Sequence, residues 1–294
     1  MKSCIIVVNG FYTNHAIEHQ VSSVKREMER LGVECSVVTS DTLPCQIQGY
    51  GSRTDLAADF IIFLDKDVHV AKMLEGCGIP VFNTPSAIEA CDDKMTTYVS
   101  LCGKGVRMPL TVSSPLMYRE AEDERVLDRI EALIPYPVVV KEAYGSMGNG
   151  VHLASDREQL RALRNRFKLY PHLYQRFIGK GGQDKRVIVI GGEIVACMLR
   201  KNDTDFRSNI EHGGTGHPTS LTKEEAEMAI NVATALGLDY CGIDILTGDD
   251  GLAYFCEANS NAFFKGIESV TGVNVAERFA RHVYNKVYGK GEER

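Results

Sequence analysis

The chain has 294 residues, which is enough for two or three packed subdomains around a sizeable core. Its net charge of −6, with 44% hydrophobic and 24% charged residues, is that of an ordinary globular protein and excludes a general nucleic-acid binder, which needs clustered Lys and Arg. No segment approaches the roughly 20 apolar residues of a membrane helix, and the first apolar run is too short for a signal peptide, so we expect a cytoplasmic protein without a membrane partner.

The first third of the chain has the pattern of a parallel α/β unit. Continuous apolar runs predict buried strands at residues 4–8, 33–38, 60–64 and 80–82. Apolar residues from Ile17 to Leu31 recur at helical spacing, which predicts an amphipathic helix that stops at Gly32. We therefore expect an N-terminal α/β subdomain over residues 1–90.

A second α/β unit is expected over residues 91–178. A helical pattern at residues 86–90 ends the first unit, and helical patterns within the second cover residues 92–101, 123–133 and 157–167. Strand patterns cover residues 138–141, 151–154 and 173–178.

A third unit is expected over residues 179–294. It opens with a hairpin pattern, in which two apolar runs flank the turn signal Gly191-Gly192. After a polar, glycine-rich segment at 200–220, a helix is predicted at 223–236, strands at 240–246 and 252–257, and a last helix from Val275 onward.

The nine cysteines form no CxxC pair. Most lie in apolar runs, so we expect reduced, buried thiols rather than disulfides or a zinc site.

The clearest local signal is a glycine-rich loop after a strand that ends in Lys141. The loop Gly145–Gly150 leads into another strand, not a helix, so it is neither a Walker A loop nor a dinucleotide-binding fingerprint. Glycines let backbone N–H groups approach phosphates, and a lysine neutralises phosphate charge. Taken alone, an ordinary hairpin loop explains the pattern about as well.

A second signal combines Asp244 with Glu257 and Asn259. The last two are two positions apart on a strand and share a face, and an Asp-Asp-Gly turn brings Asp244 nearly opposite Glu257. Three oxygen ligands then converge, as Mg²⁺ prefers. The alternative, a solvated sheet edge, explains less well why Glu257 follows an apolar run.

The third signal lies in the polar segment. Arg207 offers a planar fork for a carboxylate or an acyl phosphate, and Asn209 can orient a substrate. Taken alone, a surface loop with a structural arginine is the better interpretation. His212 follows and is interpreted as a loop or substrate-binding residue rather than a base.

Two more arginines flank the predicted hairpin. A regular two-residue turn would pair residue 186 with residue 197, so Arg186 and Arg200 would face opposite sides of the sheet unless a bulge intervenes. We expect Arg200 to face the cleft, because it leads into the Arg207 segment, and leave a structural role at the surface open for Arg186.

In this order, the motifs resemble the ATP-grasp superfamily, and within it the RimK-like glutamate ligases, from about Asp92 to Glu277. The stretch 205–209 followed by Gly213-Gly214 is the most family-specific, and Gly266–Gly272 also matches. The resemblance implies an α/β ATP-grasp fold behind an N-terminal parallel α/β subdomain.

The resemblance also implies roles for individual residues. For ATP it implies Lys94, Lys141, Gly145, Ser146, Gly148, Gly150, the hinge residues Gln175, Arg176, Phe177 and Ile178, and Asp184 at the ribose. For Mg²⁺, with Mn²⁺ as an option, it implies Asp244, Glu257 and Asn259, and for substrate chemistry Arg200, Arg207 and Asn209.

The sequence departs from the family pattern in two places. Ser260–Phe264 stands where Ser-Pro-Gly is usual after the last Asn, and Arg176 where an acidic residue is common. The first departure lies beside the acceptor region, so the second substrate is left open. Phe263 and Phe264 either line an acceptor pocket or pack in the core.

The implied activity is ATP-dependent joining of a carboxylate to an amine through an acyl phosphate. The expected partners are ATP, an amino acid such as glutamate, and a peptide, protein or small-molecule acceptor, and the protein could form a homo-oligomer. The alternatives are a ligase for another amino acid, an inactive ATP-binding module for regulation or assembly, and a carboxyl- or phosphotransferase of the same fold.

Overall fold

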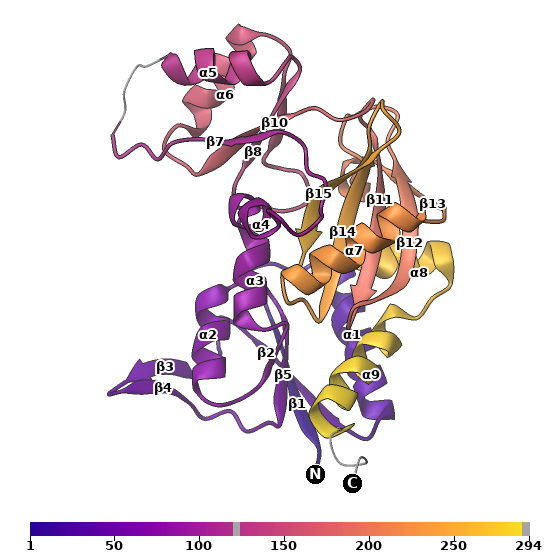
Figure 1. Ribbon diagram of the computed structural model, residues 1–294. Helices are drawn as coiled ribbons and strands as arrows, with labels where there is room; N and C mark the ends of the chain where they lie inside the picture. Colours follow the sequence, from indigo (N-terminus) through magenta and orange to yellow (C-terminus); the bar gives the residue numbers. More distant parts are fainter. Residues whose placement is uncertain (120–123, 290–294) are drawn as a thin grey trace.

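The computed structural model describes residues 1–119 and 124–289, which form successive sheets covered by helices (Figure 1). The N-terminal sheet is parallel, in the order β2-β1-β5-β6, from strands β1 (Ser3–Val8), β2 (Glu34–Thr39), β5 (Phe60–Leu64) and β6 (Val81–Phe82). The four predicted strands are thereby confirmed. A projecting hairpin, β3 (Cys45–Gln48) and β4 (Gly51–Thr54), and helix α2 (Val68–Gly76) carry no strong periodic pattern and escaped prediction.

Helix α1 (His15–Arg30) confirms the helical pattern after the first strand. The Asn14 side chain caps its start by accepting from the N–H groups of Ala16 and Ile17. Gly32, with φ at +76°, turns the chain away after the last turn, which a residue with a Cβ would do only under strain.

The central sheet is antiparallel, in the order β7-β10-β8-β9. Its strands are β7 (Thr111–Ser113), β8 (Val138–Glu142), β9 (Val151–Ala154) and β10 (His172–Arg176). Helices α5 (Arg125–Leu133) and α6 (Arg157–Phe167) share an apolar core with this sheet. The predicted start of α5 at Asp123 lies outside the described residues. Strand β10 ends at Arg176, so Phe177 and Ile178 follow it.

The C-terminal sheet is antiparallel, in the order β13-β12-β11-β14-β15. Its strands are β11 (Gln183–Ile190), β12 (Glu193–Lys201), β13 (Thr215–Pro218), β14 (Tyr240–Thr247) and β15 (Ala253–Asn259). Helix α7 (Lys223–Ala235) packs on one face together with α3 (Pro85–Asp92) and α4 (Lys94–Ser100). The polar segment contains a short 3₁₀ helix, Ile210–His212, and β13, neither of which was predicted.

The chain returns to its start through α8 (Lys265–Thr271) and α9 (Val275–Tyr288). Helix α9 runs beside α1, and a single apolar core joins the N-terminal sheet to the C-terminal sheet (Figure 1). Buried Asn83 fastens the two: its side chain accepts from the N–H groups of Asp239 and Tyr240 and donates to the carbonyls of Tyr240 and Ser260, at 2.7–2.9 Å.

The predicted subdomain limits at residues 90 and 178 stay predictions, and α3 runs across residue 90. Within the described residues, no helix is long and apolar enough to cross a membrane.

Candidate functional site

Two buried lysines lie at the junction of the central and C-terminal sheets. Lys141 is 6% exposed, and its ammonium lies 3.9 Å from the sulfur of Cys256, whose pKa burial raises to about 11. That thiol is therefore uncharged at neutral pH. Within the described residues no carboxylate lies in ion-pair distance of Lys141, so its charge is available to an anionic ligand.

Lys94 begins helix α4 and reaches the same place. Its ammonium donates to the carbonyl of Gly145 at 3.0 Å and lies 3.9 Å from a carboxylate oxygen of Glu257. Burial lowers the pKa of Lys94, and the Glu257 carboxylate partly offsets that effect. Lys94 thus ties the base of the glycine-rich loop to the C-terminal sheet.

A narrow cavity of about 90 Å³ runs between the two sheets. It brings together most of the predicted ATP residues: Lys94, Lys141, Gly148, Gln175, Arg176, Phe177, Ile178 and Asp184. Gly145 and Gly150 lie in the loop above it, whereas Ser146 lines a second cavity. The buried Gln175 amide donates to the Thr111 hydroxyl at 2.8 Å, which orients the end of β10.

The glycine-rich loop is held closed on this cavity. Gly145, Met147 and Gly148 all have positive φ, at +123°, +59° and +76°. Arg207 donates to the carbonyl of Gly148 at 3.0 Å, while the rest of its guanidinium is bound to Asp205. Arg207 therefore contacts the loop directly, a contact that sequence reasoning did not anticipate.

The expectation for Arg186 and Arg200 is corrected by a β-bulge. The ladder between β11 and β12 shifts at Ile188/Val189, so Arg186 pairs with Met198 and Arg200 with Asp184. The extra residue puts both arginines on the same face. Arg186 is therefore no surface residue: it is 9% exposed and faces the cleft, as Arg200 does.

The two arginines hold two buried carboxylates. Arg186 binds Asp244 through two nitrogens, and Arg200 binds both Asp184 and Asp244, the latter at 2.8 Å. Burial alone would lower the pKa of Arg200, but these two carboxylates raise it well above its usual value. Asp184 also accepts from the Ser208 hydroxyl, a contact that the sequence did not signal, so the predicted ribose role of Asp184 stays a prediction.

The three predicted metal ligands lie on adjacent strands. Asp244 lies opposite Glu257, as predicted, because the ladder shifts by one residue between Asp244 and Ile245, and Asn259 follows two positions later on β15. Glu257 and Asn259 face a cavity, whereas the Asp244 oxygens already accept from arginines. Because each carboxylate oxygen has two lone pairs, this donor set still fits Mg²⁺, which takes few protein oxygens. In the described part of the chain, no group of three His, Cys, Asp or Glu offers an alternative metal site.

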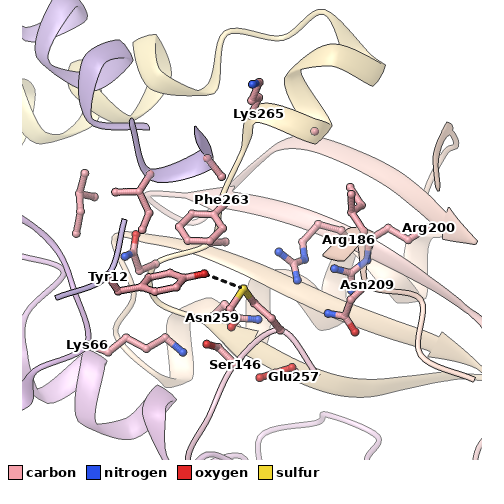
Figure 2. A pocket seen from close by; sticks show the side chains of 18 of the residues that line it. Tyr12, Lys66, Ser146, Arg186, Arg200, Asn209, Glu257, Asn259, Phe263 and Lys265 are labelled. Atoms are coloured by element: carbon pink, nitrogen blue, oxygen red, sulfur yellow. Dashed lines mark hydrogen bonds between the residues drawn. The ribbon is translucent and has the colours of Figure 1, made fainter. Parts of the chain in front are cut away.

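A larger cavity of about 510 Å³ adjoins the first, and Arg200, Asn209 and Glu257 line both. Figure 2 shows the arginines on one side of it and Tyr12 and Lys66 on the other. The N-terminal sheet thus contributes side chains that sequence reasoning missed: Asn9, Tyr12, Asp65 and Lys66. These residues follow the carboxyl ends of the parallel strands β1 and β5. Ligands usually bind at that edge of a parallel sheet, so this position in the sequence could have identified them.

The segment that departs from the family pattern divides between two environments. Phe264 is 1% exposed and packs on Tyr240 in the core, whereas Phe263 lines the larger cavity. The Gln20 amide of α1 donates to the Asn261 side chain at 3.1 Å and to the Ala262 carbonyl at 3.3 Å. This wall is therefore fixed by the N-terminal sheet and its helix.

Comparisons with known proteins agree with this geometry. The model of the RimK-like ATP-grasp domain matches residues 91–283. Human N-acetylaspartylglutamate synthase A is 38% identical over 215 residues, which are 72% of this chain and 54% of the human protein. The chain thus spans about half the length of the curated relatives it matches first. A probable alpha-L-glutamate ligase of Psychromonas ingrahamii is 36% identical over 211 residues, 70% of this chain and 68% of that protein.

Among solved structures, a RimK domain ATP-grasp protein from Sphaerobacter thermophilus superposes with a TM-score of 0.73. The two share 18% identity, over 95% of this chain and 99% of that chain, which shows the fold. The predicted ATP-grasp fold is confirmed, and the chain belongs to the RimK-like ATP-grasp family.

Proposed function

We propose that this chain is an ATP- and Mg²⁺-dependent ligase that joins a carboxylate to an amine and releases ADP and phosphate. One substrate is glutamate or another amino acid, and the acceptor is a peptide, a protein or a small molecule. The observation that carries the proposal is the meeting of two cavities at Arg200, Asn209 and Glu257. A nucleotide in the first cavity would present its terminal phosphate to a carboxylate in the second.

The proposed reaction has two steps. A carboxylate oxygen of the substrate attacks the γ-phosphorus of ATP, the bond to ADP breaks, and an acyl phosphate forms. The amine nitrogen then attacks the carbonyl carbon, the C–N bond forms, phosphate leaves, and the amine proton goes to solvent or to phosphate. Such phosphoryl transfer depends on positioning and charge neutralisation more than on covalent catalysis by the protein.

The site residues fit these requirements. Lys94 and Lys141 bring two buried positive charges to the phosphates. Glu257 and Asn259, with Asp244 behind them, would hold Mg²⁺, which supplies further neutralisation of the phosphate oxygens when bound. Asn209 lines both cavities, which supports a role in orienting the reacting carboxylate.

The glycine-rich loop would protect the acyl phosphate from water. Its contact with Arg207 closes the nucleotide cavity to about 90 Å³, whereas ligand sites usually measure about 300 Å³ or more. The loop must therefore lift to admit ATP and then close over it. Closure excludes water from a reactive intermediate, which supports a role in ligation.

The test is incubation of the protein with ATP, Mg²⁺ and amino acids, singly and in pairs, with detection of ADP and phosphate and mass spectrometry of the product. The expected result is ADP that depends on the amino acid and a product one water lighter than its two parts. AMP and pyrophosphate in place of ADP would overturn the acyl-phosphate route. ATP binding without turnover for any pair or peptide acceptor would favour an inactive module.

The control compares two variants, each of which replaces a glutamate by the uncharged glutamine. Glu257→Gln keeps the size of a cavity-lining side chain and removes its charge, so turnover should fall by at least 100-fold if Glu257 holds the metal. Glu227→Gln makes the same change on α7, where the side chain is 62% exposed and pairs with Lys223 at the surface. Equal activity of the two variants would contradict the proposed metal site.

A further inference from the structure

The glycine-rich loop belongs to the walls of both cavities. Gly148 lines the nucleotide cavity, whereas Ser146 and Met147 line the larger one. Because Met147 and Gly148 are consecutive, the loop cannot lift away from one cavity without moving at the other. A contact that holds Met147 therefore also bears on the nucleotide cavity.

Two residues hold the loop on its nucleotide side. Lys94 of α4 donates to the carbonyl of Gly145 at 3.0 Å, and Arg207 donates to the carbonyl of Gly148 at 3.0 Å. Both side chains line the nucleotide cavity, so they report on that cavity alone.

A third contact comes from the N-terminal sheet. The hydroxyl of Tyr12, which follows β1, donates to the sulfur of Met147 at 3.8 Å, along the dashed line in Figure 2. The amide of Asn14 donates to the same hydroxyl at 3.0 Å, which leaves the hydroxyl proton directed at the sulfur. Asn14 in turn caps α1, so the contact is anchored at the start of a helix.

The tip of the loop depends on such contacts. Met147 has φ at +59° and is, within the described part of the chain, the one residue other than glycine with a positive φ. A residue with a Cβ adopts this left-handed conformation at a cost in energy, and it stays there when its surroundings hold it. The bond from Tyr12 offsets a part of that cost.

We propose that Tyr12 is a positioning residue that holds the tip of the glycine-rich loop over the larger cavity, so that one closure encloses the nucleotide and the second ligand together. The inference rests on the proposed function for the identity of the two ligands. Tyr12 lines the larger cavity, yet its hydroxyl contributes to the affinity for a nucleotide in the other cavity, because consecutive residues of the loop line the two.

The first test is calorimetric binding of a non-hydrolysable ATP analogue with Mg²⁺. Tyr12→Phe removes only the hydroxyl, and Met147→Leu removes only the sulfur at nearly constant size. Each should weaken binding about 2- to 5-fold, since sulfur is a weak acceptor and a hydrogen bond contributes little net free energy. The double variant should bind no more weakly than either single variant, because both changes remove the same interaction. Tyr50→Phe, on a fully exposed tyrosine between β3 and β4, is the control and should bind as the wild type does.

The second test is hydrogen–deuterium exchange of backbone amides, with and without the analogue. In Tyr12→Phe, the amides of residues 145–150 should exchange about 2- to 5-fold faster than in the wild type, because the loop opens more often. The amides of β1 and α1 should be unchanged, since Tyr12 is 46% exposed and the helix cap remains.

Three results would overturn the proposal. The first is wild-type binding and wild-type loop exchange in Tyr12→Phe. The second is additive losses of affinity in the double variant, which would mean that Tyr12 and Met147 act separately. The third is faster exchange throughout β1 and α1, which would make Tyr12 a structural residue of the N-terminal sheet.

The outcome is separable from that of the ligase proposal. Faster loop exchange in Tyr12→Phe, with no ATP-dependent turnover of any carboxylate–amine pair by the wild type, would keep the role of Tyr12 and refute the ligase. Ligation by the wild type, with loop exchange and analogue binding in Tyr12→Phe equal to those of the wild type, would keep the ligase and refute the role of Tyr12.

Discussion

Gly148→Ala tests whether closure of the glycine-rich loop is needed for nucleotide binding. Gly148 has φ at +76°, and an added Cβ would lie 3.0 Å from the Asn209 side-chain oxygen and 3.3 Å from the Arg207 side chain. The change therefore opposes closure in two ways: it strains the backbone, and it pushes the loop away from the segment that holds it.

The magnitude follows from these two effects. A residue with a Cβ in the left-handed region costs roughly 1–2 kcal/mol. Displacement of the loop also weakens the bond from Arg207 to the Gly148 carbonyl, and a bond to a charged group is worth about 1.5–3 kcal/mol. Partial loss of that bond brings the total to about 2–3 kcal/mol, so the closed form should be about 30- to 150-fold less populated.

The assay is binding of ATP with Mg²⁺ by calorimetry, together with the midpoint of urea unfolding. Gly192→Ala is the matched control, because its φ is +82° and its Cβ would meet no atom within 4 Å. The control should lose about 1 kcal/mol of stability and no ATP affinity. If Gly148→Ala bound ATP as tightly as the control does, closure would not contribute to binding, and the reasoning would be refuted.

Three more predictions follow from burial. Asp244→Asn leaves Arg186 without its buried counter-charge, so the free energy of unfolding in urea should fall by about 3 kcal/mol. The control Lys223→Ala removes one partner of an exposed ion pair and should lower it by under about 1 kcal/mol. Similar losses in the two variants would contradict the buried pair. Phe264→Ala removes a buried core side chain and should lower the free energy of unfolding by about 3–5 kcal/mol in the same assay. Phe263→Ala changes the wall of the larger cavity and should mainly weaken substrate binding. Equal losses of stability in the two variants would refute this division of roles. Burial lowers the pKa of His172 below its usual value of 6.5, so the unfolded chain binds a proton at this residue more readily than the folded chain does. The free energy of unfolding should therefore fall as the pH drops below about 6.5. A smaller fall in His172→Asn would support this assignment, and an unchanged fall would contradict it.

The sequence by itself determined the elements with strong local patterns. The buried strands at residues 4–8 and 60–64 and the helix at 157–167 lie where apolar periodicity predicts them, because that periodicity reports which face is buried. The approximate position of Asp244 opposite Glu257 was also predictable from the short turn, whereas the pairing itself depends on a one-residue shift of the ladder between Asp244 and Ile245. Elements with weak patterns, such as the hairpin 45–54, were missed.

Only the tertiary structure decided how the arginines face the cleft. A regular hairpin would put Arg186 and Arg200 on opposite faces of the sheet, but one extra residue in β12 puts them on the same face. No turn signal in the sequence marks that bulge. The contribution of Lys66 and Tyr12 to the cavity was equally hidden. These residues follow the first strands, and only long-range packing and hydrogen bonds bring them to the C-terminal sheet. Such contacts join residues that are distant in the chain, and local periodicity contains no information about which distant surfaces pack together.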